Sequence, residues 1–157
     1  ASGVLRRRRL APPASVQVYE LTDWGYEIKP VFMVLGRWAA RSPLHDPTLP
    51  ISAVSLMMSF ETMFDPVLAG DATMTVGFVF GEEAFVVRIE NGTITTRRDA
   101  ADAADVVLTT QPPLAAACVY GKVPPAAFEA EGAMTLTGDR AVFDRFVGFF
   151  NLPEKAG

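Results

Sequence analysis

Two short runs of β-prone residues lie near the start of the chain. Val4–Leu10 and Val16–Leu21 are rich in residues that favour strands, and they flank Ala11–Ser15, which contains two prolines. This pattern predicts a β-hairpin with a longer loop. A two-stranded hairpin is not stable alone in water, so we expect other parts of the protein to support it.

A helical period follows the hairpin. After Thr22, which can cap a helix, apolar residues recur at spacings of four, three, four and three, as in a heptad seam. The pattern predicts one helix that runs to about Arg41, with a kink at Pro30. The apolar seam of this helix consists of Trp24, Ile28, Val31, Leu35 and Trp38.

From Ser52 onward the pattern predicts helix, then sheet, then helices. Ser52–Leu68 carries apolar residues over a wide sector of a helix. Period-two alternation and short β-prone runs then predict five strands, at Met74–Phe80, around Phe85, Val87 and Ile89, and at Ile94–Arg98, Val106–Thr109 and Met134–Thr137. Asn91-Gly92 suits the positive φ angles of a type I′ turn, so the second and third strands should form a tight hairpin.

Three further helices are expected in the second half of the chain. Two of them, at about Pro113–Tyr120 and Pro124–Glu131, lie between the fourth and fifth strands. The last begins at Gly138-Asp139, and its apolar residues share one face. They are Val142, Phe143, Phe146, Val147, Phe149 and Phe150.

Composition divides the chain into an arm, a linker and a body. Residues 1–41 hold seven basic and three acidic residues, a net charge of +4, whereas the remaining seven bases and fifteen acids give residues 42–157 a net charge of −8. Residues 42–50 contain three prolines and the only histidine, which is typical of a linker. We therefore predict units at 1–41, 42–50 and 51–157, with a polyanion as partner of the basic arm.

The residue types argue against catalysis. His45 lies alone in the linker, Cys118 has no histidine partner in its apolar helix, and no glycine-rich phosphate loop follows a strand. No histidine and cysteine cluster could hold zinc. We therefore expect a protein that is not an enzyme and has no cofactor or metal.

The expected location is the cytoplasm. The single cysteine suits a reducing compartment, and no apolar run approaches the roughly 18–20 residues that a membrane-spanning helix needs. The charged N-terminus is not followed by the apolar segment of a secretory signal.

The arm resembles the end of an HxlR-type winged-helix transcriptional regulator. The resemblance is carried by Gly3–Arg9, Val18–Gly25, Ile28–Val31 and Leu35–Trp38. It implies that the hairpin is the wing and that the helix after it forms a homodimer. The recognition helix would precede Ala1, so we expect this chain to bind DNA weakly or not at all.

The body resembles the sterol carrier protein type 2 fold. The marks are Phe64-Asp65-Pro66, Leu108–Pro113, Leu136–Arg140 and Phe149–Pro153. Together the pattern and the resemblance predict an α+β fold. It consists of an N-terminal β-hairpin and long helix, followed by a five-stranded, mostly antiparallel sheet covered by helices. The resemblance also implies an apolar tunnel that binds a fatty or other apolar small molecule.

Each candidate site has two interpretations. Alternate arginines of Arg6, Arg7, Arg8 and Arg9 face the same way, so one pair of them either contacts a phosphate backbone or keeps an edge strand soluble. The apolar seam packs either within its own chain or across a dimer. A set of methionine, phenylalanine and leucine side chains forms either a plain core or the wall of a ligand cavity. This set is Met57, Met58, Phe64, Phe78, Phe80, Phe85, Leu108, Met134, Phe143, Phe146 and Phe150.

The function that these patterns favour is the C-terminal part of a DNA-binding regulator whose sterol-carrier-like domain senses a small hydrophobic effector. The alternative is a stand-alone carrier of a hydrophobic ligand, or a dimerisation module without DNA-binding activity.

Overall fold

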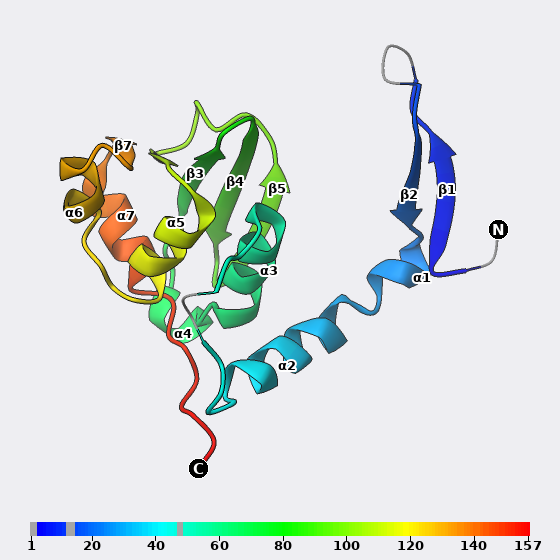
Figure 1. Ribbon diagram of the computed structural model, residues 1–157, viewed down its shortest axis with the longest axis horizontal. Coiled ribbons are helices and arrows are strands. Elements are labelled where there is room, and N and C mark those ends of the chain that lie inside the picture. Colours follow the sequence, from blue (N-terminus) through cyan, green and yellow to red (C-terminus); the bar gives the residue numbers. More distant parts are fainter. Residues whose placement is uncertain (1–2, 12–14, 47–48) are drawn as a thin grey trace.

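The N-terminal arm begins with an antiparallel hairpin, as predicted. The computed structural model describes residues 3–11, 15–46 and 49–157. Strand β1 (Leu5–Arg9) pairs with β2 (Gln17–Leu21), and part of the predicted loop at 11–15 lies outside the described residues. In Figure 1 the hairpin stands apart from the larger sheet.

The predicted helix of the arm is interrupted, and not merely kinked. Thr22 caps α1 (Asp23–Tyr26), and its hydroxyl accepts a hydrogen bond from Gly25 N at 3.0 Å. A new helix, α2 (Lys29–Ala40), then begins with Pro30 in its first turn. Proline lacks an N–H group and clashes with the preceding turn, so it suits the start of a helix and not its interior.

A proline also divides the first helix predicted for the body. Helix α3 (Ala53–Met63) starts at its cap Ser52 and ends at Phe64, and α4 (Pro66–Ala69) follows. The single helix predicted over Ser52–Leu68 is therefore wrong at its C-terminal end. The residue before a proline is driven out of the helical region, and Asp65 is accordingly extended and caps α4 through a 2.9 Å bond from Val67 N.

The body contains the predicted five-stranded sheet. Its strands are β3 (Met74–Phe80), β4 (Glu83–Glu90), β5 (Thr93–Arg98), β6 (Val106–Thr109) and β7 (Thr135–Gly138). Their order is β5-β4-β3-β6-β7, with β3 and β6 parallel and the other neighbours antiparallel. The turn between β4 and β5 has positive φ at Asn91 and Gly92, 51° and 68°, as a type I′ turn requires. The α+β fold class is thus confirmed.

Central strand β3 is covered on both faces. Helices α3, α5 (Pro112–Val119) and α7 (Arg140–Val147) pack on one face, and α6 (Pro125–Ala130) lies beside β7 (Figure 1). On the other face the connection to β6 passes so close that a Cβ atom at Gly77 would lie 2.8 Å from the Ala101 Cβ. Glycine permits this approach because it has no side chain.

The chain after α7 returns to α3. Phe149 and Phe150 were predicted on the last helix, but α7 ends at Gly148 and both residues lie beyond it. Phe150 forms an isolated bridge with Phe64, and Asp65 N donates to Phe149 O at 3.0 Å. Farther on, Ala156 N donates to Arg41 O at 2.7 Å, so the C-terminal tail also contacts the end of α2.

We predict that Phe60→Ala lowers the free energy of unfolding by about 3–5 kcal/mol, because the ring is fully buried in the centre of the body. Urea denaturation measures this loss. Val67→Ala, at an 86% exposed position of α4, is the control and should change the stability by less than about 0.5 kcal/mol. A loss below about 1 kcal/mol for Phe60→Ala would contradict the central role of this ring.

Candidate functional site

The interior of the body is built around Phe60 of α3. Its ring lies 5.2 Å from the Phe78 ring, 5.6 Å from Phe146, 5.3 Å from Phe150 and 6.1 Å from Tyr120, measured between centroids. These partners come from β3, α7, the segment after α7, and the end of α5. We call these five residues the aromatic cluster. Rings at such distances contact one another in tilted or edge-on arrangements.

The structure brings ten of the eleven predicted pocket residues into this interior. The ten are at most 9% exposed and belong to one core: Met57, Phe64, Phe78, Phe80, Phe85, Leu108, Met134, Phe143, Phe146 and Phe150. Met58 does not join them, since it lies on the outer side of α3 with 42% of its surface exposed. The interior is therefore one continuous apolar region between the helices and the sheet.

One hydroxyl pair lies at the edge of the aromatic cluster. The Ser59 Oγ and Tyr120 Oη atoms are 2.5 Å apart and share a hydrogen bond. Burial raises the pKa of Tyr120 well above its usual range, and the bond from Ser59 only partly offsets this rise. Tyr120 therefore stays neutral and acts as a hydrogen-bonding group within an apolar region.

Cys118 and Lys122 lie near this pair but have structural roles. Burial, with a smaller effect of the Glu129 charge, raises the pKa of the Cys118 thiol to about 11, so the thiol is not a ready nucleophile. Lys122 Nζ donates to Val147 O at 2.7 Å and to Phe150 O at 2.6 Å, and burial lowers the pKa of this ammonium group. The two hydrogen bonds from Lys122 fix the carbonyl groups at the end of α7 and just after it.

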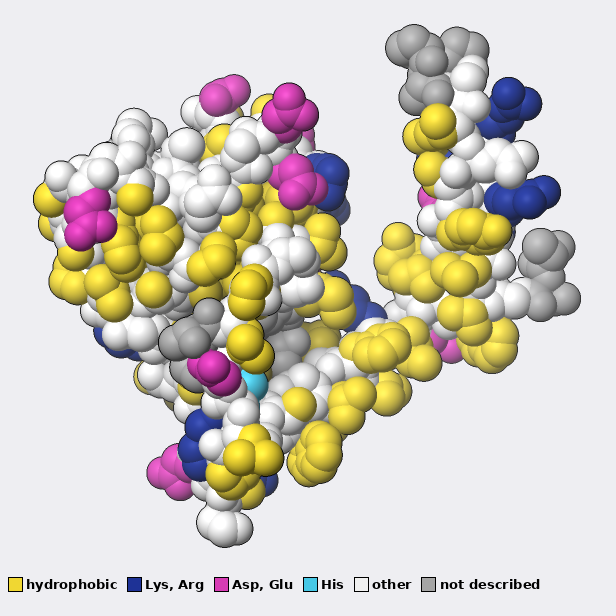
Figure 2. All heavy atoms as spheres, viewed as in Figure 1, with side chains coloured by type: hydrophobic (Ala, Val, Ile, Leu, Met, Phe, Trp, Pro, Cys, Tyr) yellow, Lys and Arg dark blue, Asp and Glu magenta, His cyan; other side chains and the backbone are white. Residues whose placement is uncertain are grey.

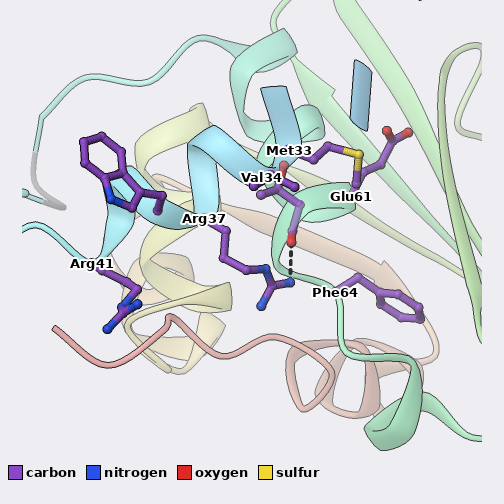
Figure 3. A pocket seen from close by; sticks show the side chains of 8 residues that line it. Met33, Val34, Arg37, Arg41, Glu61 and Phe64 are labelled. Atoms are coloured by element: carbon purple, nitrogen blue, oxygen red, sulfur yellow. Dashed lines mark hydrogen bonds between the residues drawn. The ribbon is translucent and has the colours of Figure 1, made fainter. Parts of the chain in front are cut away.

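A second region lies outside the interior, between the arm and the body. A groove of about 480 Å³ runs between α2 and α3 (Figure 3). Its lining residues are Met33, Val34, Arg37, Trp38, Arg41, Glu61, Thr62 and Phe64. We call it the α2–α3 groove.

Polar contacts hold the two helices of this groove together. Arg37 donates to the Thr62 carbonyl oxygen at 2.5 Å, the bond drawn as a dashed line in Figure 3. Glu61 is ion-paired with Lys29, and its Oε1 accepts bonds from Thr96 N at 3.1 Å and Thr96 Oγ1 at 2.8 Å. Glu61 thus connects α2, α3 and β5.

The sequence reasoning missed the groove residues of α2. A signal for them exists, because Lys29, Met33, Arg37 and Arg41 repeat every four positions and form a second stripe beside the apolar seam. Their partners Glu61 and Thr62 lie more than twenty positions away. No local pattern could have identified them.

Comparison with known proteins bears mainly on the body. The family model described as alkyl sulfatase C-terminal matches residues 50–156. The chain belongs to the alkyl sulfatase C-terminal family. No curated protein sequence matches it.

A solved structure of a longer protein has a similar fold. The stereoselective inverting sec-alkylsulfatase Pisa1 from Pseudomonas sp. is similar at a TM-score of 0.58 and 20% identity, over 64% of this chain and 16% of that one. The chain therefore spans about one sixth of the length of that enzyme.

Two structures named for sterol carrier proteins are also similar, at lower scores. The ubiquinone synthesis protein UbiJ-SCP2 has a TM-score of 0.46 and 12% identity, over 83% of this chain and 93% of its own. The sterol carrier protein domain 2 of Helicoverpa armigera has a TM-score of 0.41 and 14% identity, over 57% and 75%.

The hairpin arginines precede the part of the chain that matches the alkyl sulfatase C-terminal family, and the structure separates them into two pairs. The Nε atoms of Arg6 and Arg8 lie 3.0 and 3.5 Å from Glu20 Oε2, so their charge is partly compensated. Arg7 and Arg9 alternate to the other side of β1, where the described residues offer them no acidic partner. Of the two pairs, Arg7 and Arg9 are the better placed to meet an anion.

The apolar seam is largely exposed within the described part of the chain. Trp24, Ile28, Val31, Leu35 and Trp38 are 42–69% exposed, and Figure 2 shows hydrophobic side chains along the outer side of the arm. Helix α2 uses a different face, with Gly36 near the Thr62 methyl group, to contact α3. The five side chains are thus only partly covered by the described residues, and packing across a dimer stays a prediction.

Two kinds of site are not seen among the described residues. No group of three or more histidine, cysteine or acidic side chains is arranged to hold a metal ion within 3–11, 15–46 and 49–157. Over the same residues, no helix is both long and apolar enough to cross a membrane.

Proposed function

We propose that the alkyl sulfatase C-terminal domain, residues 50–156, binds an alkyl chain or a similar apolar small molecule between its helices and its sheet. The observation that carries this proposal is the convergence of ten apolar side chains, from α3, β3, β4, β6, α7 and the segments beside them, on one interior. Such a lining suits a ligand with a flexible hydrocarbon chain. Methionines such as Met57 and Met63 can adapt to it because their unbranched side chains have several rotatable bonds.

The Ser59–Tyr120 pair is the polar anchor in this proposal. Small-molecule sites are mostly apolar and hold few polar groups that orient the ligand. A ligand hydroxyl could exchange hydrogen bonds with the neutral Tyr120 while its chain replaces ring contacts of the aromatic cluster. To admit the chain of a ligand, the segment after α7 would have to shift, because the Phe150 ring closes the cluster.

The proposed role is binding and not catalysis. The high pKa of Cys118 argues against a nucleophilic thiol, and His45 lies in the linker outside the interior. Any chemical step would then belong to another part of a longer protein or to a partner. A single, buried cysteine favours a reducing compartment, and cytoplasmic location remains a prediction on that ground.

We expect decanol to raise the melting temperature in proportion to the logarithm of its concentration once it exceeds Kd. At about 100 times Kd the gain is about 2.7 kcal/mol, or roughly 5–10 °C for a domain of this size. Differential scanning fluorimetry and native mass spectrometry measure the shift and the bound molecule.

Two adjacent methionines provide a matched test of where decanol binds. Met57→Phe enlarges a side chain that is 3% exposed and should abolish the decanol shift, whereas Met58→Phe, at a 42% exposed position of the same helix, should retain it. Each variant is compared with its own melting temperature without decanol. Absence of any shift in the wild-type chain, or an equal shift in both variants, would refute interior binding.

A second candidate function concerns the arm, and the separated Arg7 and Arg9 favour it. We propose that the hairpin contacts the phosphate backbone of DNA, as expected for the wing of an HxlR-type regulator. In that case residues 50–156 would sense a hydrophobic effector on behalf of a DNA-binding protein. Contacts to phosphate add affinity without reading the base sequence.

We predict weak DNA binding that depends strongly on salt and little on sequence. Replacing both Arg7 and Arg9 with glutamine should lower the affinity for DNA roughly tenfold at about 50 mM salt. It should also flatten the salt dependence of the affinity, because binding without these two phosphate contacts releases fewer counterions. Fluorescence anisotropy with matched and scrambled duplexes measures both effects. The control replaces Arg6 and Arg8 with glutamine. This change should lower the affinity less, because Glu20 already partly compensates the charge of these two arginines. Equal loss in the two double variants would contradict the assignment of the phosphate-binding side.

The exposed seam supports a homodimer as part of the same proposal. Five large apolar side chains in a row on one helical arm would be covered by the seam of a second copy. Tryptophan is frequent among the residues that dominate binding energy at interfaces. A dimer would also place two hairpins on one assembly.

We predict that Leu35→Asp converts the dimer to a monomer in sedimentation equilibrium, since it places a charge within the apolar seam. Leu35 does not line the α2–α3 groove, so the result is independent of that site. Val67→Asp puts the same charge on an exposed position of α4 and should leave the dimer intact. A wild-type chain that is monomeric at high micromolar concentration would exclude the dimer.

A further inference from the structure

The α2–α3 groove is lined partly by residues that lie outside the alkyl sulfatase C-terminal domain. Met33, Val34, Arg37, Trp38 and Arg41 precede the matched residues 50–156, whereas the opposite wall belongs to α3 and its end. The groove has a volume of about 480 Å³ and is largely open to solvent. It lies outside the aromatic cluster, so ligand binding in the groove does not depend on ligand binding in the interior.

One end of the groove carries two positive charges. Arg37 and Arg41 are four positions apart on α2, so they lie on the same helical face with Cβ atoms about 5–6 Å apart. Figure 3 shows both side chains on the same side of α2. Like charges at this spacing repel each other, and an anion bound between them would remove that repulsion.

Both guanidinium groups keep N–H donors for a ligand. One guanidinium nitrogen of Arg37 donates a hydrogen bond to Thr62 O at 2.5 Å, and the Nε atom of Arg41 donates to Glu154 O at 3.3 Å. Among the described residues these two side chains have no acidic partner within ion-pair distance. The arginines are thus held in place by carbonyl groups while their charge remains uncompensated.

The C-terminal end of α2 favours basic side chains, but its carbonyl groups do not occupy the N–H donors of Arg37 and Arg41. Lys155 Nζ already donates to Ala40 O and Ser42 O, at 3.1 Å each, and so satisfies carbonyls at the C-terminal end of α2. Arg37 and Arg41 therefore remain available for an anion.

The rest of the groove is apolar or neutralised. Met33, Val34 and Trp38 form one side, and Phe64, at 8% exposure, lies at the base. The one acidic lining residue, Glu61, is paired with Lys29 and bound by Thr96, so it does not repel an anion at the arginine end. A smaller hollow of about 290 Å³ shares Trp38 and Arg41 and extends the groove toward the tail.

We propose that the α2–α3 groove binds a small amphiphile that consists of an alkyl chain with a single anionic oxygen head group, a carboxylate or a sulfate. The head group accepts hydrogen bonds from Arg37 and Arg41, since planar guanidinium groups match oxyanions well. The chain lies along Met33, Val34 and Phe64. Binding at this place would report the ligand to the arm, because α2 and α3 must keep their spacing around it.

Tryptophan fluorescence can test this site directly. The chain has two tryptophans, so Trp24→Phe leaves Trp38, at the groove, as the only one. Decanoate with a terminal bromine should quench Trp38 emission saturably at concentrations below micelle formation. Arg37→Gln and Arg41→Gln should each raise Kd roughly fivefold, the loss expected for one partly exposed charged hydrogen bond. Salt should weaken binding as well.

Matched ligands and variants separate the outcomes. Bromodecyl sulfate tests whether the sulfate head binds like the carboxylate, and bromodecanol, without a charge, should bind at least tenfold more weakly. Arg97→Gln removes the same charge from β5, on the face opposite Thr96, and should leave Kd unchanged. Arg41→Lys keeps the charge and should recover part of the affinity.

Several results would overturn the proposal. They are equal quenching by the brominated decanoate and by bromodecanol, an unchanged Kd in Arg41→Gln with a native circular dichroism spectrum, or no quenching at all. A rise in melting temperature with decanol but no quenching of Trp38 by the brominated decanoate would refute the groove and leave interior binding intact. Quenching that depends on Arg37 and Arg41, without a rise in melting temperature with decanol, would support the groove and refute interior binding.

Discussion

Packing of the Phe60 ring against four other aromatic rings determines where the rest of the molecule can lie. The ring joins α3 to β3, to α7 and to the segment after α7, and so fixes the orientation of α3 on the sheet. Residues 61 and 62 then point to the other side of the same helix. There Glu61 binds Lys29 and Thr96, and the Thr62 carbonyl accepts a bond from Arg37. One turn of helix thus supports both the apolar interior and the contact with the arm.

This arrangement explains why two different binding regions can exist in one small protein. The interior is enclosed by the family domain alone and holds few polar groups, so it favours an uncharged chain. The α2–α3 groove needs the arm as its second wall and carries uncompensated arginines, so it favours an anionic amphiphile. Because α3 separates the two regions, a change that loosens α3 would affect both, whereas a surface change such as Arg41→Gln would affect one.

Prediction from the sequence succeeded for elements that depend on a local pattern of a few residues. Alternation and short β-prone runs identified all five strands, Asn91-Gly92 identified the turn between β4 and β5, and Thr22 was correctly expected to cap a helix. The errors occurred at prolines and at a helix end. Pro30 and Pro66 each begin a new helix where a continuous or merely kinked helix was expected, and Gly148 ends α7 before Phe149. Apolar periodicity continues across Gly148 because Phe146, Phe149 and Phe150 are all buried in the same core, whereas at Pro30 it continues along a surface that stays exposed.

The sequence by itself determined the elements, the fold class and ten of the residues that meet in the interior, since each depends on spacing along a few turns or strands. Only the tertiary structure decided that Arg7 and Arg9, and not Arg6 and Arg8, lack an acidic partner among the described residues, and that the apolar seam stays exposed. It also decided that Arg37 and Arg41 line a groove opposite Phe64. Contacts such as those of Arg37 with Thr62 and of Ser59 with Tyr120 join positions 25 and 61 residues apart. Their formation depends on how packed layers approach one another, and no local period in the chain encodes that distance.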